Sequence, residues 1–249
     1  MVAARRCQLV VTHSPAEVQA QVLEHITHER RRNRQPVVLF DLDGTLFDNG
    51  PRTWEILREF ARETGRAGLL AKLEAFPRVM LPYTLAETLA EVDETDPVLC
   101  QDALAFWKAR FFRDEYIRHD EPLAGARSFV QRCWGEGATV VYFSGRDSAG
   151  MLLGTAQSLR THGFPVGLAR TVITLKEAFE TEDLHFKRES VQFLNTLGSV
   201  VASFDNEPGN CNMFAGTWPQ AVTVALATSH APNPVPLAPS VKVTDGFAE

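Results

Sequence analysis

Short, largely apolar runs recur along the chain, and within each run the residues do not alternate between apolar and polar. The runs lie at residues 36–40, 139–143, 171–174, 200–204 and 221–225. This pattern is typical of strands that are buried on both faces of a parallel sheet. Most of the intervening segments have helical periodicity, at residues 125–134, 148–161 and 187–197. Strand and helix in alternation predict an α/β fold with a doubly wound parallel sheet.

The interval between the first two predicted strands breaks this alternation. Helical patterns occupy residues 51–64, 82–92 and 97–117, with little strand character between them. The last pattern carries a stripe of large apolar residues, which suits the core of a helical domain better than the wall of a substrate pocket; its members are Leu104, Trp107, Phe111, Phe112 and Tyr116. We therefore expect an inserted helical domain over residues 49–120.

An earlier helix is predicted before the first strand. Ser14 and Glu17 have the spacing of a capping box, Pro15 suits the first helical position, and the helix should run to about Arg32. Its end is a basic run, residues 29–34, which could contact nucleic acid. A solvated helix end is the favoured interpretation, because cations complement the helix dipole there.

These patterns predict three parts of the chain. Residues 1–35 form a helical extension packed on the core. Residues 36–48 and 121–249 form the α/β core, and residues 49–120 form the insert between them.

Composition narrows the class of protein. The chain has 249 residues, 45% of them hydrophobic, and a net charge of −6, which argues against nucleic acid as the main partner. Four dispersed cysteines fit neither a zinc site nor a disulfide framework, so reduced thiols are expected at Cys7, Cys100, Cys133 and Cys211. No stretch has the length of a membrane span and the first residues make an unconvincing secretion signal, so the expected location is the cytoplasm.

The first predicted strand ends in the sequence Asp-Leu-Asp-Gly-Thr, residues 41–45. Asp41 and Asp43 are two residues apart, so on an extended segment their carboxylates point the same way. Gly44 permits a sharp turn, and Thr45 offers a hydroxyl and an N–H to an anion. Ligands of open α/β sheets bind beyond the carboxyl ends of the strands, which predicts a binding site here.

Two further clusters follow in chain order. Ser144 and Gly145, at the end of a strand, can cradle an anion, and Arg146 can bind a substrate phosphate or pair with a neighbouring carboxylate. Lys187, at the expected start of a helix, can neutralise a transferring phosphoryl group, with Lys176 as the competing candidate.

The last cluster follows the strand at residues 200–204. Asp205 is the natural ligand for Mg²⁺, which prefers oxygen ligands and keeps several waters. With Asp41, Asp43 and Asn206 it makes up the predicted metal site. Glu207 and Asn210 are alternative residues to complete the metal shell.

The ordered set of four clusters resembles the haloacid-dehalogenase-like hydrolase superfamily, over the core from about residue 36 to 225. The resemblance implies a Rossmann-like core in which Asp41 is the nucleophile, Asp43 the general acid and base, and Lys187 the stabilising lysine. It assigns phosphate binding to Thr45 and Ser144, and Mg²⁺ binding to Asp205. The position of the insert resembles that of the helical caps that close over small substrates in this superfamily.

The expected activity is thus magnesium-dependent hydrolysis of a small phosphorylated metabolite, through an aspartyl-phosphate on Asp41. Dehalogenases of the superfamily lack the second aspartate, so Asp43 favours phosphate chemistry. Two alternatives stay open: a phosphomutase of the same superfamily, and a non-catalytic binding protein with a phosphatase fold. The sequence specifies neither the substrate nor the oligomeric state.

Overall fold

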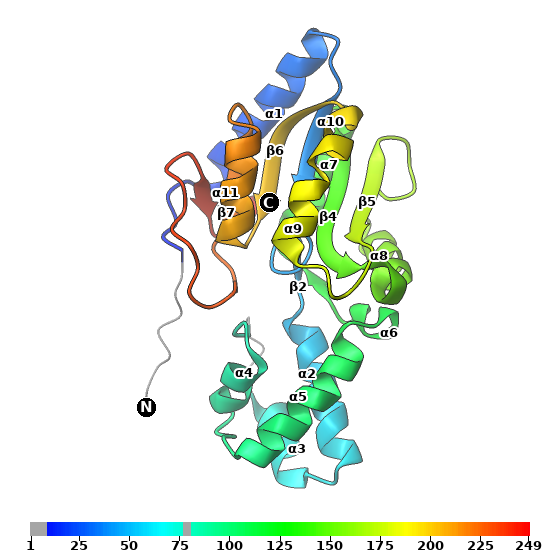
Figure 1. Cartoon of the computed structure of the whole chain (residues 1–249), viewed down its shortest axis with the longest axis vertical. Coiled ribbons are helices and arrows are strands. Elements are labelled where there is room, and N and C mark those ends of the chain that lie inside the picture. Colours follow the sequence, from blue (N-terminus) through cyan, green and yellow to red (C-terminus); the bar gives the residue numbers. More distant parts are fainter. Residues whose placement is uncertain (1–8, 77–80) are drawn as a thin grey trace.

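The computed structural model describes residues 9–76 and 81–249 of the chain; Cys7 lies outside these ranges. Its centre is a six-stranded sheet in the order β5-β4-β1-β6-β7-β8, in which every neighbouring pair is parallel (Figure 1). The strands are β1 (Pro36–Phe40), β4 (Thr139–Asp147), β5 (Thr171–Lys176), β6 (Ser199–Asp205), β7 (Val222–Leu226) and β8 (Lys242–Thr244).

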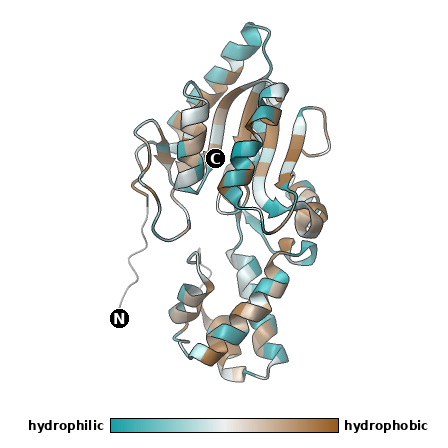
Figure 2. Cartoon of the chain, in the orientation of Figure 1, coloured by the Kyte–Doolittle hydropathy of each residue, from teal (hydrophilic) through white to brown (hydrophobic). Residues whose placement is uncertain are grey.

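Helices cover both faces of this sheet, as the apolar runs predicted. Val38 and Phe40 of β1 point into a cluster with α1 (Pro15–Arg31), α7 (Ala126–Gly135) and α8 (Ser148–Thr161). Val37 and Leu39 point the other way, towards α9 (Asp183–Glu189), α10 (Val191–Leu197) and α11 (Pro208–Thr217). Figure 2 shows apolar strands between helices whose outer surfaces are hydrophilic. The doubly wound α/β fold is confirmed.

Several element boundaries differ from the predictions. The segment at residues 187–197 is two helices, and Lys187 lies in the last turn of α9 rather than at the start of a helix. Helix α11 and strand β8 were not predicted; β8 follows the proline-rich segment and pairs with β7. At the other end of the chain, the capping box of Ser14 and Glu17 is present and begins α1.

The insert is a group of helices with a hydrophobic cluster of its own. It contains α2 (Gly50–Glu63), α3 (Ala67–Ala75), α4 (Leu85–Glu91), α5 (Pro97–Phe111) and α6 (Asp114–Ile117). The single helix predicted over residues 97–117 is broken after Phe111, and α3 was not predicted. A two-stranded antiparallel ribbon, β2 (Phe47–Asp48) with β3 (Glu121–Pro122), joins the insert to the core.

Two further findings concern the described residues. None of their helices is long and apolar enough to cross a membrane. Cys100, Cys133 and Cys211 are free thiols, the last two fully buried in the core.

Candidate active site

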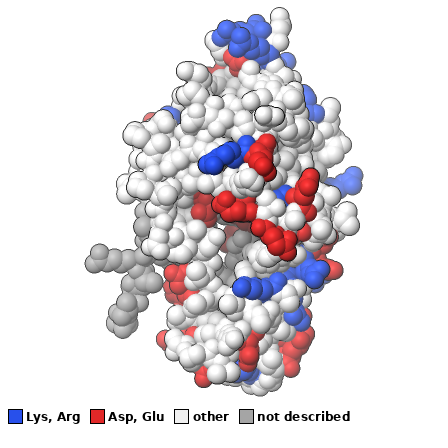
Figure 3. Space-filling model, in the orientation of Figure 1, with Lys and Arg blue, Asp and Glu red and all other residues white. Residues whose placement is uncertain are grey.

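A cleft of about 270 Å³ lies where the carboxyl edge of the sheet meets the insert. The core lines it with the loop after β1, the ends of β4 and β6, and α9, while the insert contributes the start of α2 and the end of α5. Figure 3 shows acidic side chains gathered across the middle of the molecule, where the core and the insert meet. The cleft is the place that strand-end ligand binding predicts.

Backbone hydrogen bonds hold the loop after β1 in its conformation. The Asp41 N–H continues the sheet ladder by donating to the Phe204 carbonyl, 2.9 Å away, and the carbonyl of Leu42 accepts N–H groups of the following turn. Leu42 itself is fully buried, which leaves Asp41 and Asp43 on the cleft side. Gly44 has φ +72°, and a Cβ there would collide with the Asn206 side chain, so the turn requires glycine.

Lys187 joins two carboxylates at the base of the cleft. Its Nζ donates to Asp41 Oδ1 at 2.8 Å and to Asp205 Oδ2 at 2.6 Å. All three side chains are buried. Burial lowers the pKa of Lys187, but the two carboxylates outweigh it and raise that pKa, so the ammonium stays charged.

The negative charge of Asp41 is only partly compensated by Lys187, which Asp205 shares. Burial raises its pKa well above the usual range; Lys187 opposes this shift, and the negative charge of Asp205 reinforces it. Lys176, the competing lysine, does not line the cleft: its Nζ donates to the Thr181 carbonyl and to Asp183 Oδ1, both at 2.9 Å. The structure therefore brings Lys187, and not Lys176, to Asp41.

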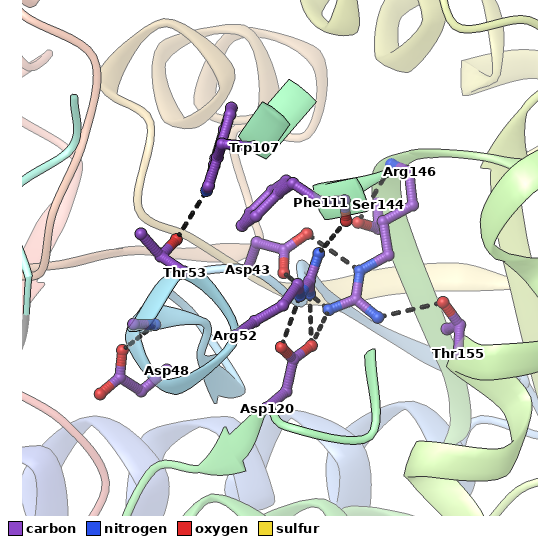
Figure 4. Close-up of polar contacts among 11 residues, drawn as sticks. Asp43, Asp48, Arg52, Thr53, Trp107, Phe111, Asp120, Ser144, Arg146 and Thr155 are labelled. Atoms are coloured by element: carbon purple, nitrogen blue, oxygen red, sulfur yellow. Dashed lines mark hydrogen bonds and ion pairs between the residues drawn. The ribbon is translucent and has the colours of Figure 1, made fainter. Parts of the chain in front are cut away.

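Asp43 belongs to a second buried cluster with two arginines (Figure 4). Arg146 donates to both of its oxygens, from Nε at 2.9 Å and from Nη2 at 2.6 Å, and Arg52 Nη2 donates to Oδ1 at 3.1 Å. Asp120, fully buried, accepts from both guanidinium groups. Burial raises the pKa of Asp43, but Arg146 and Arg52 outweigh it and hold that pKa below the usual range.

In this second cluster Arg146 pairs with carboxylates, which is one of the two roles predicted for it. Its remaining donor, Nη1, reaches Thr155 Oγ1 at 3.0 Å, so its guanidinium is paired with carboxylates and a hydroxyl. Arg52 and Asp120 were not predicted. One signal for Arg52 was present, because it precedes Ile56 by one turn on the buried side of α2. No motif marked Asp120.

The predicted phosphate-binding residues separate into two groups. Ser144 and Gly145 line the cleft, and Gly145 packs so closely on the Asp183 carboxylate that a Cβ there would displace that side chain. Thr45 does not line it: its side chain is fully buried, and its hydroxyl donates to Asn206 Oδ1 at 3.4 Å. Thr45 therefore supports the loop from beneath instead of facing a ligand.

Asn206 is held in the same way. Its Nδ2 donates to the Ser229 carbonyl at 2.6 Å, so its carboxamide ties the loop after β6 to the loop after β7. The neighbouring residues are differently placed. Asn210 Nδ2 lies 3.2 Å from each oxygen of Asp205, and Glu207 lines the cleft while its Oε1 accepts the Ala231 N–H at 2.9 Å.

The donor set suits a hard divalent cation. Within the described residues, no group of three or more His, Cys, Asp or Glu side chains is arranged to hold a metal by itself. Mg²⁺ does not need such a cage, since it binds through one or two carboxylates and keeps waters. Asp41 Oδ2 receives no hydrogen bond from the described residues, and two buried carboxylates face a single ammonium. A cation beside Asp41 and Asp205 fits this charge balance.

Comparisons with known proteins agree with this geometry. Neither a family model nor a curated protein sequence matches the chain. Solved structures do. A candidate phosphatase from Clostridium difficile has a TM-score of 0.55 at 12% identity and covers 86% of this chain and 95% of its own. A haloacid-dehalogenase-like hydrolase from Streptococcus pneumoniae has a TM-score of 0.51 at 12% identity, covering 85% and 94%.

A third similar structure is CbbY from Rhodobacter sphaeroides, determined in complex with xylulose 1,5-bisphosphate. It has a TM-score of 0.51 at 14% identity and covers 87% of this chain and 96% of its own. Fold and cleft together define a doubly wound α/β protein with a cleft at the carboxyl edge of the sheet. Its fold is that of the haloacid-dehalogenase-like hydrolases.

Proposed function

We propose that the chain is a magnesium-dependent phosphatase that hydrolyses a small phosphorylated metabolite through an aspartyl-phosphate on Asp41. One observation carries the proposal: Lys187 bridges Asp41 and Asp205 at the base of a cleft that the insert covers. A purely structural salt bridge does not require two buried carboxylates on one lysine, because the second carboxylate stays undercompensated.

In the first step, an oxygen of Asp41 attacks phosphorus in line, and the bond between phosphorus and the ester oxygen breaks. The phosphoryl group is then on Asp41, and the leaving oxygen takes a proton from protonated Asp43 and departs as the alcohol. Lys187 stabilises charge on the transferring group, and the Ser144 hydroxyl and the Gly145 N–H are the nearest neutral donors at the strand end. The chain thereby replaces one difficult displacement with two easier ones.

In the second step, water attacks phosphorus, the bond between phosphorus and the Asp41 oxygen breaks, and inorganic phosphate leaves. Asp43 accepts the proton of this water as a general base; Arg146 and Arg52 keep its carboxylate ionised and in place, but by lowering its pKa they also weaken it as a base. Carrying that proton to the leaving group of the next substrate requires the pairing with Arg146 to loosen. The two arginines therefore set the position of Asp43 and the ease with which it is protonated.

Asp41 and Asp205, with the Asp43 carbonyl and either Glu207 or Asn210, would hold the Mg²⁺ ion. When bound, the ion supplies positive charge that offsets the repulsion between the Asp41 carboxylate and an anionic phosphate. Asn206 is the least suited of the predicted ligands, because Thr45 and Ser229 already engage both ends of its carboxamide.

The test is phosphate release from a panel of phosphorylated metabolites and one aryl phosphate, with and without Mg²⁺. The Asp41→Asn and Lys187→Met variants are measured beside Asp245→Asn, which changes an exposed aspartate at the far end of the chain. We expect Mg²⁺-dependent release that disappears in Asp41→Asn, is strongly reduced in Lys187→Met and persists in Asp245→Asn. Release that survives in Asp41→Asn would exclude the covalent mechanism, and release from no substrate would favour the non-catalytic alternative.

A further inference from the structure

One wall of the cleft is built from aromatic side chains of the insert, at the end of α5. Trp107 stacks on Phe111 with ring centroids 4.3 Å apart and planes 28° apart, and Phe112 lies edge-on to both rings. All three line the cleft. The stripe that the sequence assigned to the core of the insert is therefore divided, because these members face the site while Leu104 is exposed.

Contacts on several sides hold this aromatic wall in place. Trp107 Nε1 donates to Thr53 Oγ1 at 3.1 Å, which fixes the orientation of the indole, and Arg52 lies 4.3 Å from the centre of the Phe111 ring (Figure 4). Phe112 also contacts Phe179 of the core, with ring centroids 4.7 Å apart. Preorganised rings lose little conformational entropy when a flat group stacks on them.

The charges around the cleft limit what can enter beside the reacting phosphate. Among the described residues that line it, six are acidic, at positions 41, 43, 48, 183, 205 and 207, and two are basic, Arg146 and Lys187. Both basic groups are already paired with carboxylates. A second phosphate on the substrate would meet Asp48 and Glu207, together with Asp183, whose charge Lys176 offsets, and these lining residues supply no free cation.

We propose that the cleft selects a phosphomonoester with one phosphate and a flat aromatic leaving group bearing hydrogen-bond donors, and that it rejects sugar bisphosphates. Trp107 and its aromatic neighbours stack on the ring, while Asp48 and Asp183 accept from its hydroxyl or amino groups. The inference rests on the proposed phosphatase function. A nucleoside monophosphate carries both an aromatic ring and such donors, whereas the phosphate of a simple aryl alcohol carries the ring alone.

The acidic residues that line the cleft also bear on the phosphomutase alternative. An enzyme that moves a phosphate between two positions of a sugar has to bind a bisphosphate. CbbY, whose fold is similar, has been seen with such a compound. Repulsion by Asp48 and Glu207 works against that class of ligand here, since like charges brought together in a partly buried site cost free energy.

The experiment compares kcat/KM for adenosine monophosphate, phenyl phosphate, glycerol phosphate and fructose 1,6-bisphosphate in four proteins. These are the wild type, Trp107→Ala, Asp48→Asn and Trp218→Phe, the last a control at the opposite edge of the sheet. The preference for aromatic over glycerol phosphate should fall roughly 5- to 100-fold in Trp107→Ala, the range that loss of one aromatic stack gives. It should be unchanged in Trp218→Phe, and Asp48→Asn should raise the relative rate on the bisphosphate.

The two aromatic substrates distinguish a nucleotide from a simple aryl ester. A wild type that prefers the bisphosphate, or a Trp107→Ala variant with an unchanged substrate ratio, would overturn the inference and leave the phosphatase proposal standing. Binding of the same four compounds to Asp41→Asn by calorimetry tests the wall without turnover. Selective binding of the aromatic compounds, together with no hydrolysis by the wild type, would support the proposed selectivity and contradict the proposed phosphatase function. Equal binding of all four compounds would contradict the selectivity.

Discussion

Two buried charge clusters flank the cleft, and they differ in balance. On one side, Lys187 faces two carboxylates, Asp41 and Asp205. On the other, Arg52 and Arg146 face Asp43 and Asp120, so that two cations meet two anions. The balanced cluster satisfies itself and holds its parts in place. The unbalanced cluster has one positive charge fewer than negative charges, and a metal ion can supply the missing one. Oδ2 of Asp41, which accepts no hydrogen bond from the described residues, is available for chemistry.

Removing one member of the balanced cluster should give the largest loss of stability. Asp120→Asn leaves two buried guanidinium groups with only Asp43, and breaking a buried pair in this way costs about 3–5 kcal/mol. Urea unfolding followed by circular dichroism measures the loss. Asp102→Asn, at an exposed site on α5 where it removes only the exposed pair with Arg66, is the matched control and should change the free energy of unfolding by less than about 1 kcal/mol. Equal effects of the two substitutions would contradict the structural role of the Arg52 cluster.

Metal addition should act on the unbalanced cluster alone. At a Mg²⁺ concentration of about 100 times Kd, binding to the folded state adds roughly 2.7 kcal/mol to the free energy of unfolding. A thermal-shift titration should show this stabilisation in the wild type and its loss in Asp205→Ala. The same titration of Arg52→Met should still show a Mg²⁺ response, from a lower starting Tm. Retention of the full shift in Asp205→Ala would place the ion elsewhere.

The two clusters should respond to pH with opposite signs in metal-free buffer. The folded-state pKa of Asp43 is lowered, so its contribution to stability is present above the ordinary aspartate pKa of about 4 and is lost as pH falls further. The folded-state pKa of Asp41 is raised, so its ionisation removes stability as pH rises from about 4 through that raised value. Unfolding of Asp43→Asn and Asp41→Asn across this range separates them, because each should remove one slope; parallel profiles would contradict the assignment.

The smallest effect on stability is expected at an exposed ion pair. Arg66 and Asp102 of the insert are joined at 3.4 Å and both side chains are partly exposed to water. A double-mutant cycle with alanine at the two positions should yield an interaction energy of about 0.2–1 kcal/mol. A value as large as the loss in Asp120→Asn would mean that burial does not explain the strength of the inner clusters.

The sequence was sufficient for five of the six strands of the sheet and for the residues that follow them. Apolar runs identify buried strands because period and composition are local properties, and Asp41, Lys187 and Asp205 follow from the order of motifs along the chain. Contacts between the core and the insert were not predictable in the same way. Arg52 and Asp120 are 68 residues apart in the chain and meet only when the insert folds back on the sheet. Likewise, the burial of Thr45 depends on Asn206, which follows β6 and is 161 residues away along the chain.

The β2–β3 ribbon makes the insert resemble an exchangeable cassette. Because Phe47 pairs with Pro122 and Asp48 with Glu121, the chain leaves the core and returns to it at adjacent points. Gene segments encoding other helical inserts could be spliced between these points without altering the path of β1 or β4. The junctions, however, have to carry Arg52 and Asp120 together, since a transplanted cassette that supplies only one of them would leave the buried cluster with three charges and a net charge of one sign.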